Sequence, residues 1–144
     1  MARNQRFIDA PPERVFAVLA DPDRYADWVV GSREIRDADD AFPEPGTRFH
    51  HSIGMWPLIV RDHTEVLEAD PPWRLRLEAK ARPLGQATVT LDLAPERDGT
   101  RVTMIEDPSG YAMPLRFVPL THLVTRLRNA ESLRRLAELV ERRA

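Results

Sequence analysis

Residues 119–143 read PLTHLVTRLRNAESLRRLAELVERR, and this stretch decides the fold that we expect for the whole chain. Its apolar residues recur in steps of three and four, which is typical of one face of a helix; they are Leu120, Leu123, Val124, Leu127, Ala130, Leu133, Ala137 and Val140. The opposite face is rich in arginine and glutamate. A helix of this length spans about 35 Å, so it can cross a small domain and needs a wide apolar surface to cover it.

Upstream of this helix the apolar residues change to a period of two, which is typical of strands with one buried face. We expect seven strands, near residues 3–9, 33–39, 47–53, 58–68, 73–81, 87–93 and 101–106. Asp98 and Gly99 predict a tight hairpin between the last two. Symmetric hairpins pair Leu77 with Leu91, and Leu91 or Leu93 with Met104. A sheet with one apolar face needs one cover, which the C-terminal helix supplies.

Two short helices are predicted after the first strand. The first covers residues 13–20 and follows a pair of prolines, which suit a first helical turn. Asp21 is placed to cap the second, with Pro22 at its first position. Tyr25 and Trp28 are three residues apart, so we expect both to attach this second helix to the core.

The composition fits one globular domain over residues 1–144, with 42% hydrophobic and 31% charged residues. The net charge of −2, without a long run of one sign, argues against a nucleic-acid partner. The absence of cysteine excludes disulfides, thiolate metal sites and thiol catalysis. The first residues lack the apolar core of a signal peptide, and no segment of the sequence is long enough to span a bilayer. We therefore expect a cytoplasmic location and no stable membrane insertion.

Four stretches resemble the START-like, or SRPBCC, superfamily: APPERVF at 10–16, DPDRYADW at 21–28, VLEADPPWRL at 66–75 and GTRVT at 99–103. The resemblance implies an α+β helix-grip fold, in which a curved seven-stranded antiparallel sheet wraps around a long C-terminal helix. Members often enclose an apolar cavity for lipids, polyketides, quinones or steroid-like molecules. Some are cyclases or aromatases and many are carriers or regulators. Catalytic residues are not shared across the superfamily, so none is carried over.

Three polar residues, His51, Asp62 and Glu106, are expected on the apolar face of the sheet, where burial is costly unless they are paired. A hairpin centred on Met55 and Trp56 makes His51 and Asp62 diagonal neighbours, so that Asp62 could fix the tautomer of His51. Glu106 could be a carboxyl group whose pKa is raised by an apolar cavity. The same residues also fit a structural pair of His51 with Asp62, and a contact of Glu106 with an arginine or a backbone amide.

The leading hypothesis is a cavity that binds a small hydrophobic ligand, oriented by a few polar groups. Its expected lining is Phe49, His51, Asp62, Leu75, Leu77, Val89, Leu91, Met104, Glu106, Leu123 and Leu127. One alternative is a cyclase- or dehydratase-type enzyme with His51 as the proton carrier. Another is an interaction module whose cavity is filled by its own side chains. No metal-ligand spacing or phosphate-binding loop occurs in the sequence, so we expect no metal and no cofactor.

The connection at residues 108–118 is unusually apolar for a surface loop. It fits a lid over the cavity, a homodimer contact or a filler of the core, and the sequence leaves these three open. Met113 and Phe117 are the residues of this segment that we expect to touch a ligand if it is a lid.

Overall fold

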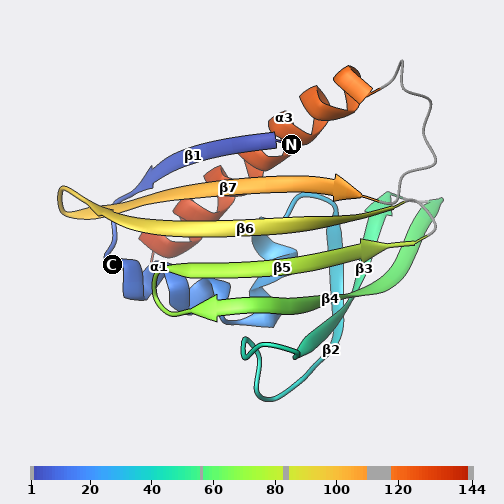
Figure 1. The fold of residues 1–144 in the computed structure, drawn as a ribbon, viewed down its shortest axis with the longest axis horizontal. Helices are drawn as coiled ribbons and strands as arrows, with labels where there is room; N and C mark the ends of the chain where they lie inside the picture. The colour runs from blue at the N-terminus through green and yellow to red at the C-terminus, as the bar shows by residue number, and fades with distance from the viewer. Residues whose placement is uncertain (1, 56, 83–84, 110–117, 143–144) are drawn as a thin grey trace.

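The computed structural model of the protein describes residues 2–55, 57–82, 85–109 and 118–142. The strands are β1 (Ala2–Ile8), β2 (Ser32–Ala38), β3 (Arg48–Met55), β4 (Leu58–Asp70), β5 (Arg74–Ala81), β6 (Gly85–Glu96) and β7 (Gly99–Ser109). The helices are α1 (Pro12–Leu19), the 3-10 helix η1 (Pro22–Arg24), α2 (Tyr25–Trp28) and α3 (Val118–Glu141) (Figure 1).

All seven strands form one curved antiparallel sheet in the order β1-β7-β6-β5-β4-β3-β2 (Figure 1). From β2 to β7, strands that follow one another in the chain are paired, because short hairpins join most of them, and β1 pairs with β7. β2 lies at an edge, as its polar sequence predicts. The expected α+β helix-grip fold is confirmed.

The short helices follow the sequence prediction closely. The apolar face of α1 is buried, and the side chain of Asp21 caps η1 by accepting a hydrogen bond from the Asp23 backbone amide at 3.1 Å. Tyr25 and Trp28 are both buried, with ring centroids 5.2 Å apart. The Tyr25 hydroxyl donates to the Leu19 carbonyl at 2.6 Å, which ties α2 back to the end of α1.

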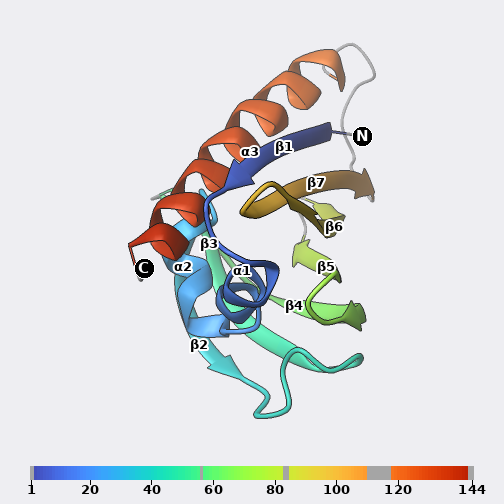
Figure 2. The ribbon, with the colours of Figure 1, turned by 90° about the vertical axis from the view of Figure 1, so that its left-hand side faces the viewer.

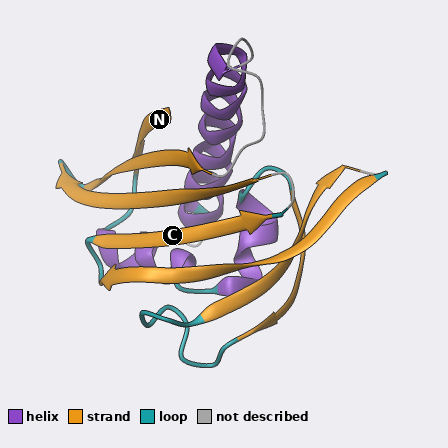
Figure 3. Ribbon diagram, turned by 45° about the vertical axis from the view of Figure 1, so that its right-hand side comes forward, coloured by secondary structure: helices purple, strands orange, loops and turns teal. Residues whose placement is uncertain are grey.

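α3 runs beside β1 and also contacts α1 and α2, which lie near its C-terminal half (Figure 2). Leu133, Ala137 and Val140 of the predicted apolar face are buried. The prediction is wrong for the preceding turns, because Leu123 and Leu127 are 52% and 64% exposed. This part of the helix rises beyond the edge strands (Figure 3), and apolar spacing identifies a buried face only where another element covers it.

The buried face of α3 continues instead through two polar residues. Asn129 and Ser132 are each 1% exposed and lie in helical register with the fully buried Leu136. The Ser132 hydroxyl accepts a hydrogen bond from the Val30 backbone amide at 3.0 Å, which joins α3 to the segment after α2. The helix therefore presents a mixed face, polar in the middle and apolar toward its C-terminus.

Two strand registers differ from the symmetric hairpins that we predicted. His51 pairs directly with Asp62, which was expected to be its diagonal neighbour, and Leu77 pairs with Val89 in place of Leu91, so each register is shifted by two residues. A shift of two residues keeps every side chain on its expected face, so the predicted inner face is unchanged. Of the two partners predicted for Met104, Leu91 and Leu93, the structure has Leu91.

The β6–β7 turn is built on Arg97 and Asp98, because Glu96 pairs with Gly99. Arg97 takes the positive φ of 53°, so the positions of the turn are one residue earlier than predicted. Gly99 is required for a different reason. A Cβ atom there would lie 2.3 Å from the Ile8 carbonyl oxygen and 2.6 Å from the Phe7 ring, so only glycine allows β1 to approach this closely.

Candidate functional site

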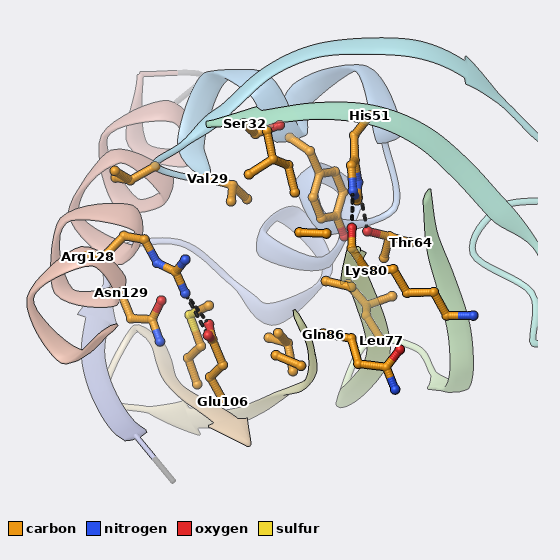
Figure 4. Close-up of a pocket in the computed structure, with 18 of the residues that line it drawn as sticks. Val29, Ser32, His51, Thr64, Leu77, Lys80, Gln86, Glu106, Arg128 and Asn129 are labelled. Atoms are coloured by element: carbon orange, nitrogen blue, oxygen red, sulfur yellow. Dashed lines mark hydrogen bonds and ion pairs between the residues drawn. The ribbon is translucent and has the colours of Figure 1, made fainter. Parts of the chain in front are cut away.

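A cavity of about 190 Å³ lies between the inner face of the sheet and helices α2 and α3 (Figure 4). Its wall is mostly apolar and includes small residues such as Ala79 and Ala87. Of the residues predicted to line it, those that do so are Phe49, His51, Leu77, Val89, Leu91, Met104 and Glu106. They come from β3, β5, β6 and β7, whose alternating apolar residues predict one buried face.

Other predicted lining residues are elsewhere. Leu75 is fully buried on the inner face of β5, but it belongs to the apolar core and not to the cavity wall. Leu123 and Leu127 are exposed and do not line the cavity, because the helix presents Arg128 and Asn129 there. Met113 and Phe117 lie outside the described residues, as does most of the 108–118 segment, so its three alternatives stay predictions.

His51 is buried, and both of its ring nitrogens are hydrogen-bonded. Nε2 lies 2.8 Å from the Lys80 carbonyl oxygen, so it carries the proton and donates it. Nδ1 then accepts from the Thr64 hydroxyl at 3.0 Å (Figure 4). Burial lowers the pKa of His51 below its ordinary 6.5, and the Lys80 carbonyl and Asp62 offset only part of this effect. The ring is therefore a neutral, fixed part of the cavity wall.

Asp62 does not set the tautomer of His51, contrary to our prediction, and it does not line the cavity. Its carboxylate binds Arg82 instead, accepting from the backbone amide at 2.9 Å and from Nε and Nη2 at 3.1 and 3.0 Å. Burial raises the pKa of Asp62, but these hydrogen bonds outweigh it and hold the pKa well below its usual range. Asp62 thus fastens the chain just after β5 to β4.

Glu106 is buried in the cavity wall and pairs with an arginine. Nη2 of Arg128, on α3, lies 2.6 and 2.7 Å from the two carboxylate oxygens of Glu106 (Figure 4). The ion pair bridges β7 and α3 across the side of the cavity. This agrees with the structural alternative for Glu106, a contact with an arginine.

Several lining residues escaped sequence reasoning. Tyr25 and Trp28 are buried in the core, as predicted, and they also line the cavity. Thr64, which the sequence does not single out, lines it as well. Arg128 and Asn129 were overlooked because they lie off the apolar stripe of the helix. Asn129, Ser132 and Leu136 do follow helical spacing. Hydrophobic periodicity counts apolar residues only, however, so it does not identify a buried helix face that contains polar residues.

In the part of the chain that the structure describes, no three His, Asp or Glu side chains gather as a metal ion would require. Among the same residues, no helix is both long enough and apolar enough to cross a membrane. The arrangement can therefore be described as an apolar cavity with a few buried polar groups in its wall, most of them already paired.

A model of the family described as polyketide cyclase/dehydrase and lipid transport matches residues 2–141 of this chain. No curated protein matches the chain.

Solved structures with the same fold cover nearly the whole chain. The Zhui aromatase/cyclase from Streptomyces sp. R1128 is 14% identical, with a TM-score of 0.78 over 99% of this chain and 93% of its own. Protein CV1439 from Chromobacterium violaceum is 24% identical, with a TM-score of 0.73 over 96% and 95%. TTHA0849 from Thermus thermophilus is also 24% identical, with a TM-score of 0.71 over 99% and 98%. At these identities the likenesses show the fold alone.

Proposed function

The chain belongs to the polyketide cyclase/dehydrase and lipid transport family, and we propose that it binds a small hydrophobic ligand in the cavity between the sheet and α3. The observation that carries the proposal is the cavity itself, which the packing of sheet and helices leaves open in an otherwise continuous core. Native interiors are close-packed, so a void of this size needs an explanation.

The size and lining of the cavity support an apolar guest. An engineered apolar cavity of about 150 Å³ is known to bind benzene, so about 190 Å³ suffices for a compact aromatic or aliphatic group. Leu77, Leu91 and Met104 supply apolar contact from three neighbouring strands. The gain from such contacts is proportional to the apolar area removed from water, which favours uncharged, oily molecules.

The chemistry of His51 does not favour the enzyme alternative. A proton carrier needs a ring nitrogen within reach of the substrate, and both nitrogens of His51 already bind Lys80 and Thr64. Glu106, the other predicted polar residue that lines the wall, is occupied by Arg128. Binding, in contrast to catalysis, requires only that His51 and Glu106 form part of the cavity wall.

A matched pair of variants tests the proposal with α-methylstyrene as the probe. Ala87→Leu fills the cavity, whereas Ala94→Leu adds the same atoms to an exposed position of the same strand. We expect α-methylstyrene to raise the unfolding temperature of the natural protein and of Ala94→Leu, because a ligand that binds only the folded state stabilises it. The rise should vanish in Ala87→Leu. No rise in the natural protein, or an equal rise in both variants, contradicts the proposal.

A further inference from the structure

Asn129 is a buried amide that the described protein leaves unsatisfied. It is 1% exposed and lines the cavity, and neither its Oδ1 nor its Nδ2 has a hydrogen-bond partner among the described residues. Figure 4 shows the amide extending from α3 beside the Glu106–Arg128 pair. Buried polar side chains in native proteins are nearly always hydrogen-bonded, so each exception calls for an explanation.

The neighbours of Asn129 are engaged with other partners and do not hydrogen-bond to its amide. Arg128 binds both carboxylate oxygens of Glu106, and the Ser132 hydroxyl accepts from the Val30 amide. Across the cavity, His51 and Thr64 bind each other, and His51 also binds the Lys80 carbonyl. The unsatisfied amide thus stands out from a wall whose other buried polar groups are mostly paired.

A second group in the wall has the same property. Trp28 is 1% exposed and lines the cavity, and its indole Nε1 has no hydrogen-bond partner among the described residues. An indole N–H can only donate, whereas the Asn129 amide offers both a donor and an acceptor, whichever way the amide is turned. The Asn129 amide can therefore serve a guest group that both accepts and donates a hydrogen bond, and the Trp28 indole can serve a group that accepts one.

The charges in the wall select against an ionised guest. The Glu106 carboxylate is buried and would repel a second carboxylate, while the Arg128 guanidinium is already engaged by Glu106. The Glu106–Arg128 pair is neutral as a whole, and the ammonium of Lys80, a residue that also lines the cavity, is paired with Glu78 at 3.4 Å, so neither pair leaves a charge for an ionic guest to balance. A neutral polar group on the guest is not repelled by Glu106 and needs no balancing charge.

We infer that the ligand is a neutral molecule whose apolar body carries one polar group able both to accept and to donate a hydrogen bond, such as a carboxamide or a hydroxyl, held by Asn129 and Trp28. The inference rests on the proposed function, since it specifies the guest of the same cavity. Asn129 and Trp28 then act as specificity residues, because a guest without the polar group leaves their amide and indole unpaired.

Four probes with the same number of non-hydrogen atoms and nearly the same shape test this inference. α-Methylstyrene has no hydrogen-bonding group, acetophenone only accepts, benzamide accepts and donates, and benzoate is charged. Affinities are measured by calorimetry for the natural protein and for Asn129→Leu, Trp28→Phe and Ser132→Ala. Ser132→Ala is the matched control, since Ser132 is equally buried on α3 but does not line the cavity. Comparing each probe across the variants removes the differing solvation of the free probes in water.

We expect Asn129→Leu to weaken benzamide binding about tenfold or more and to leave α-methylstyrene unchanged or tighter. Trp28→Phe should weaken both benzamide and acetophenone, each by about threefold to tenfold. Ser132→Ala should change no ratio between probes, and benzoate should bind most weakly to the natural protein.

Other outcomes overturn the inference in distinct ways. Equal losses for benzamide and α-methylstyrene in Asn129→Leu would give Asn129 a structural role only. Unchanged benzamide binding would mean that buried water satisfies the amide. The tightest binding by benzoate would refute the neutral guest. If α-methylstyrene binds and the polar probes gain nothing from Asn129, the proposed function stands without this inference. If no probe binds, both are wrong.

Discussion

The space between the sheet and α3 has a filled end and a hollow end. At the filled end, Leu133, Leu136 and Val140 of α3 belong to one buried apolar cluster with Ile8 and Leu19. At the hollow end the same helix contributes Arg128 and Asn129, and the wall opposite contains His51, Thr64 and Glu106 around the cavity. One helix and one sheet therefore make a close-packed core and a void within a few turns.

The two ends also differ in how their side chains are held. Apolar side chains can adjust their rotamers to fill space, whereas a hydrogen-bonded ring or an ion pair is held by the geometry of its partners. His51 and Glu106 are both held in this way, by Lys80 and Arg128. The filled end is thus expected to carry most of the stability of the fold, and the hollow end its capacity to bind.

The most direct test of this difference between the two ends is to truncate one leucine in each half of α3. Leu136→Ala removes a fully buried side chain and should lower the free energy of unfolding by about 2–5 kcal/mol. Leu127→Ala removes one that is 64% exposed and should change it by about 0.5 kcal/mol or less. Urea unfolding measures both. Comparable losses would show that the N-terminal half of the helix is covered in solution.

Adding atoms at each end gives the converse test. Gly99→Ala places one carbon against the Ile8 carbonyl at the filled end and should cost about 1–3 kcal/mol. Ala87→Leu adds three carbons at the hollow end and should cost less than about 1 kcal/mol, because the cavity receives them. Unfolding free energies in urea decide the order. A larger cost for Ala87→Leu would mean that the void is not available to side chains.

The ion pair at the hollow end gives a prediction of similar or smaller size. Arg128→Met leaves the buried Glu106 carboxylate without its partner and should lower the unfolding free energy by about 1–3 kcal/mol. Arg128 is itself partly exposed, so the loss stays below that of a fully buried pair. The double variant Arg128→Met/Glu106→Gln should recover most of it. A double variant no more stable than Arg128→Met would show that the unpaired Glu106 carboxylate is not the cause of the lost stability.

The smallest expected effect is a pH dependence from His51. The pKa of His51 is lowered in the folded protein. As the pH drops below about 6.5, the unfolded chain therefore binds more protons than the folded protein, and the unfolding free energy decreases as the pH decreases. His51→Gln should flatten this slope between about pH 7 and about pH 5. Burial also lowers the pKa of His63, so His63→Gln is the matched control that keeps the contribution of His51. An unchanged slope in His51→Gln contradicts the assignment.

Sequence reasoning predicted the fold well, because it depends on patterns that a single strand or helix carries. The alternation in β5 and β6, the Asp21 cap and the Tyr25–Trp28 pair each identified a local structure that the folded protein contains. Registers were predicted less well, since the symmetric hairpins predicted for β3–β4 and β5–β6 are each shifted by two residues in the structure. Even so, the inner face of the sheet was predicted correctly, because a shift of two residues preserves it.

The site was harder to predict because its partners come from distant segments. No local pattern joins His51 to the Lys80 carbonyl, or Glu106 to Arg128, and these contacts decide what each polar group does. Asn129 was overlooked for a related reason. Its burial depends on where α3 meets the sheet, and hydrophobic spacing points instead to Leu127, which is exposed.

The hydrogen bonds of the His51 ring reach across three consecutive strands, from β3 through Thr64 on β4 to Lys80 on β5. They form a cross-tie between these strands that is complete without a guest in the cavity. Reshaping the cavity to accept a different guest therefore need not disturb the cross-tie. Ala79, Ala87 and Val89, which line the void without belonging to the cross-tie, are the positions at which a library of altered specificities should begin.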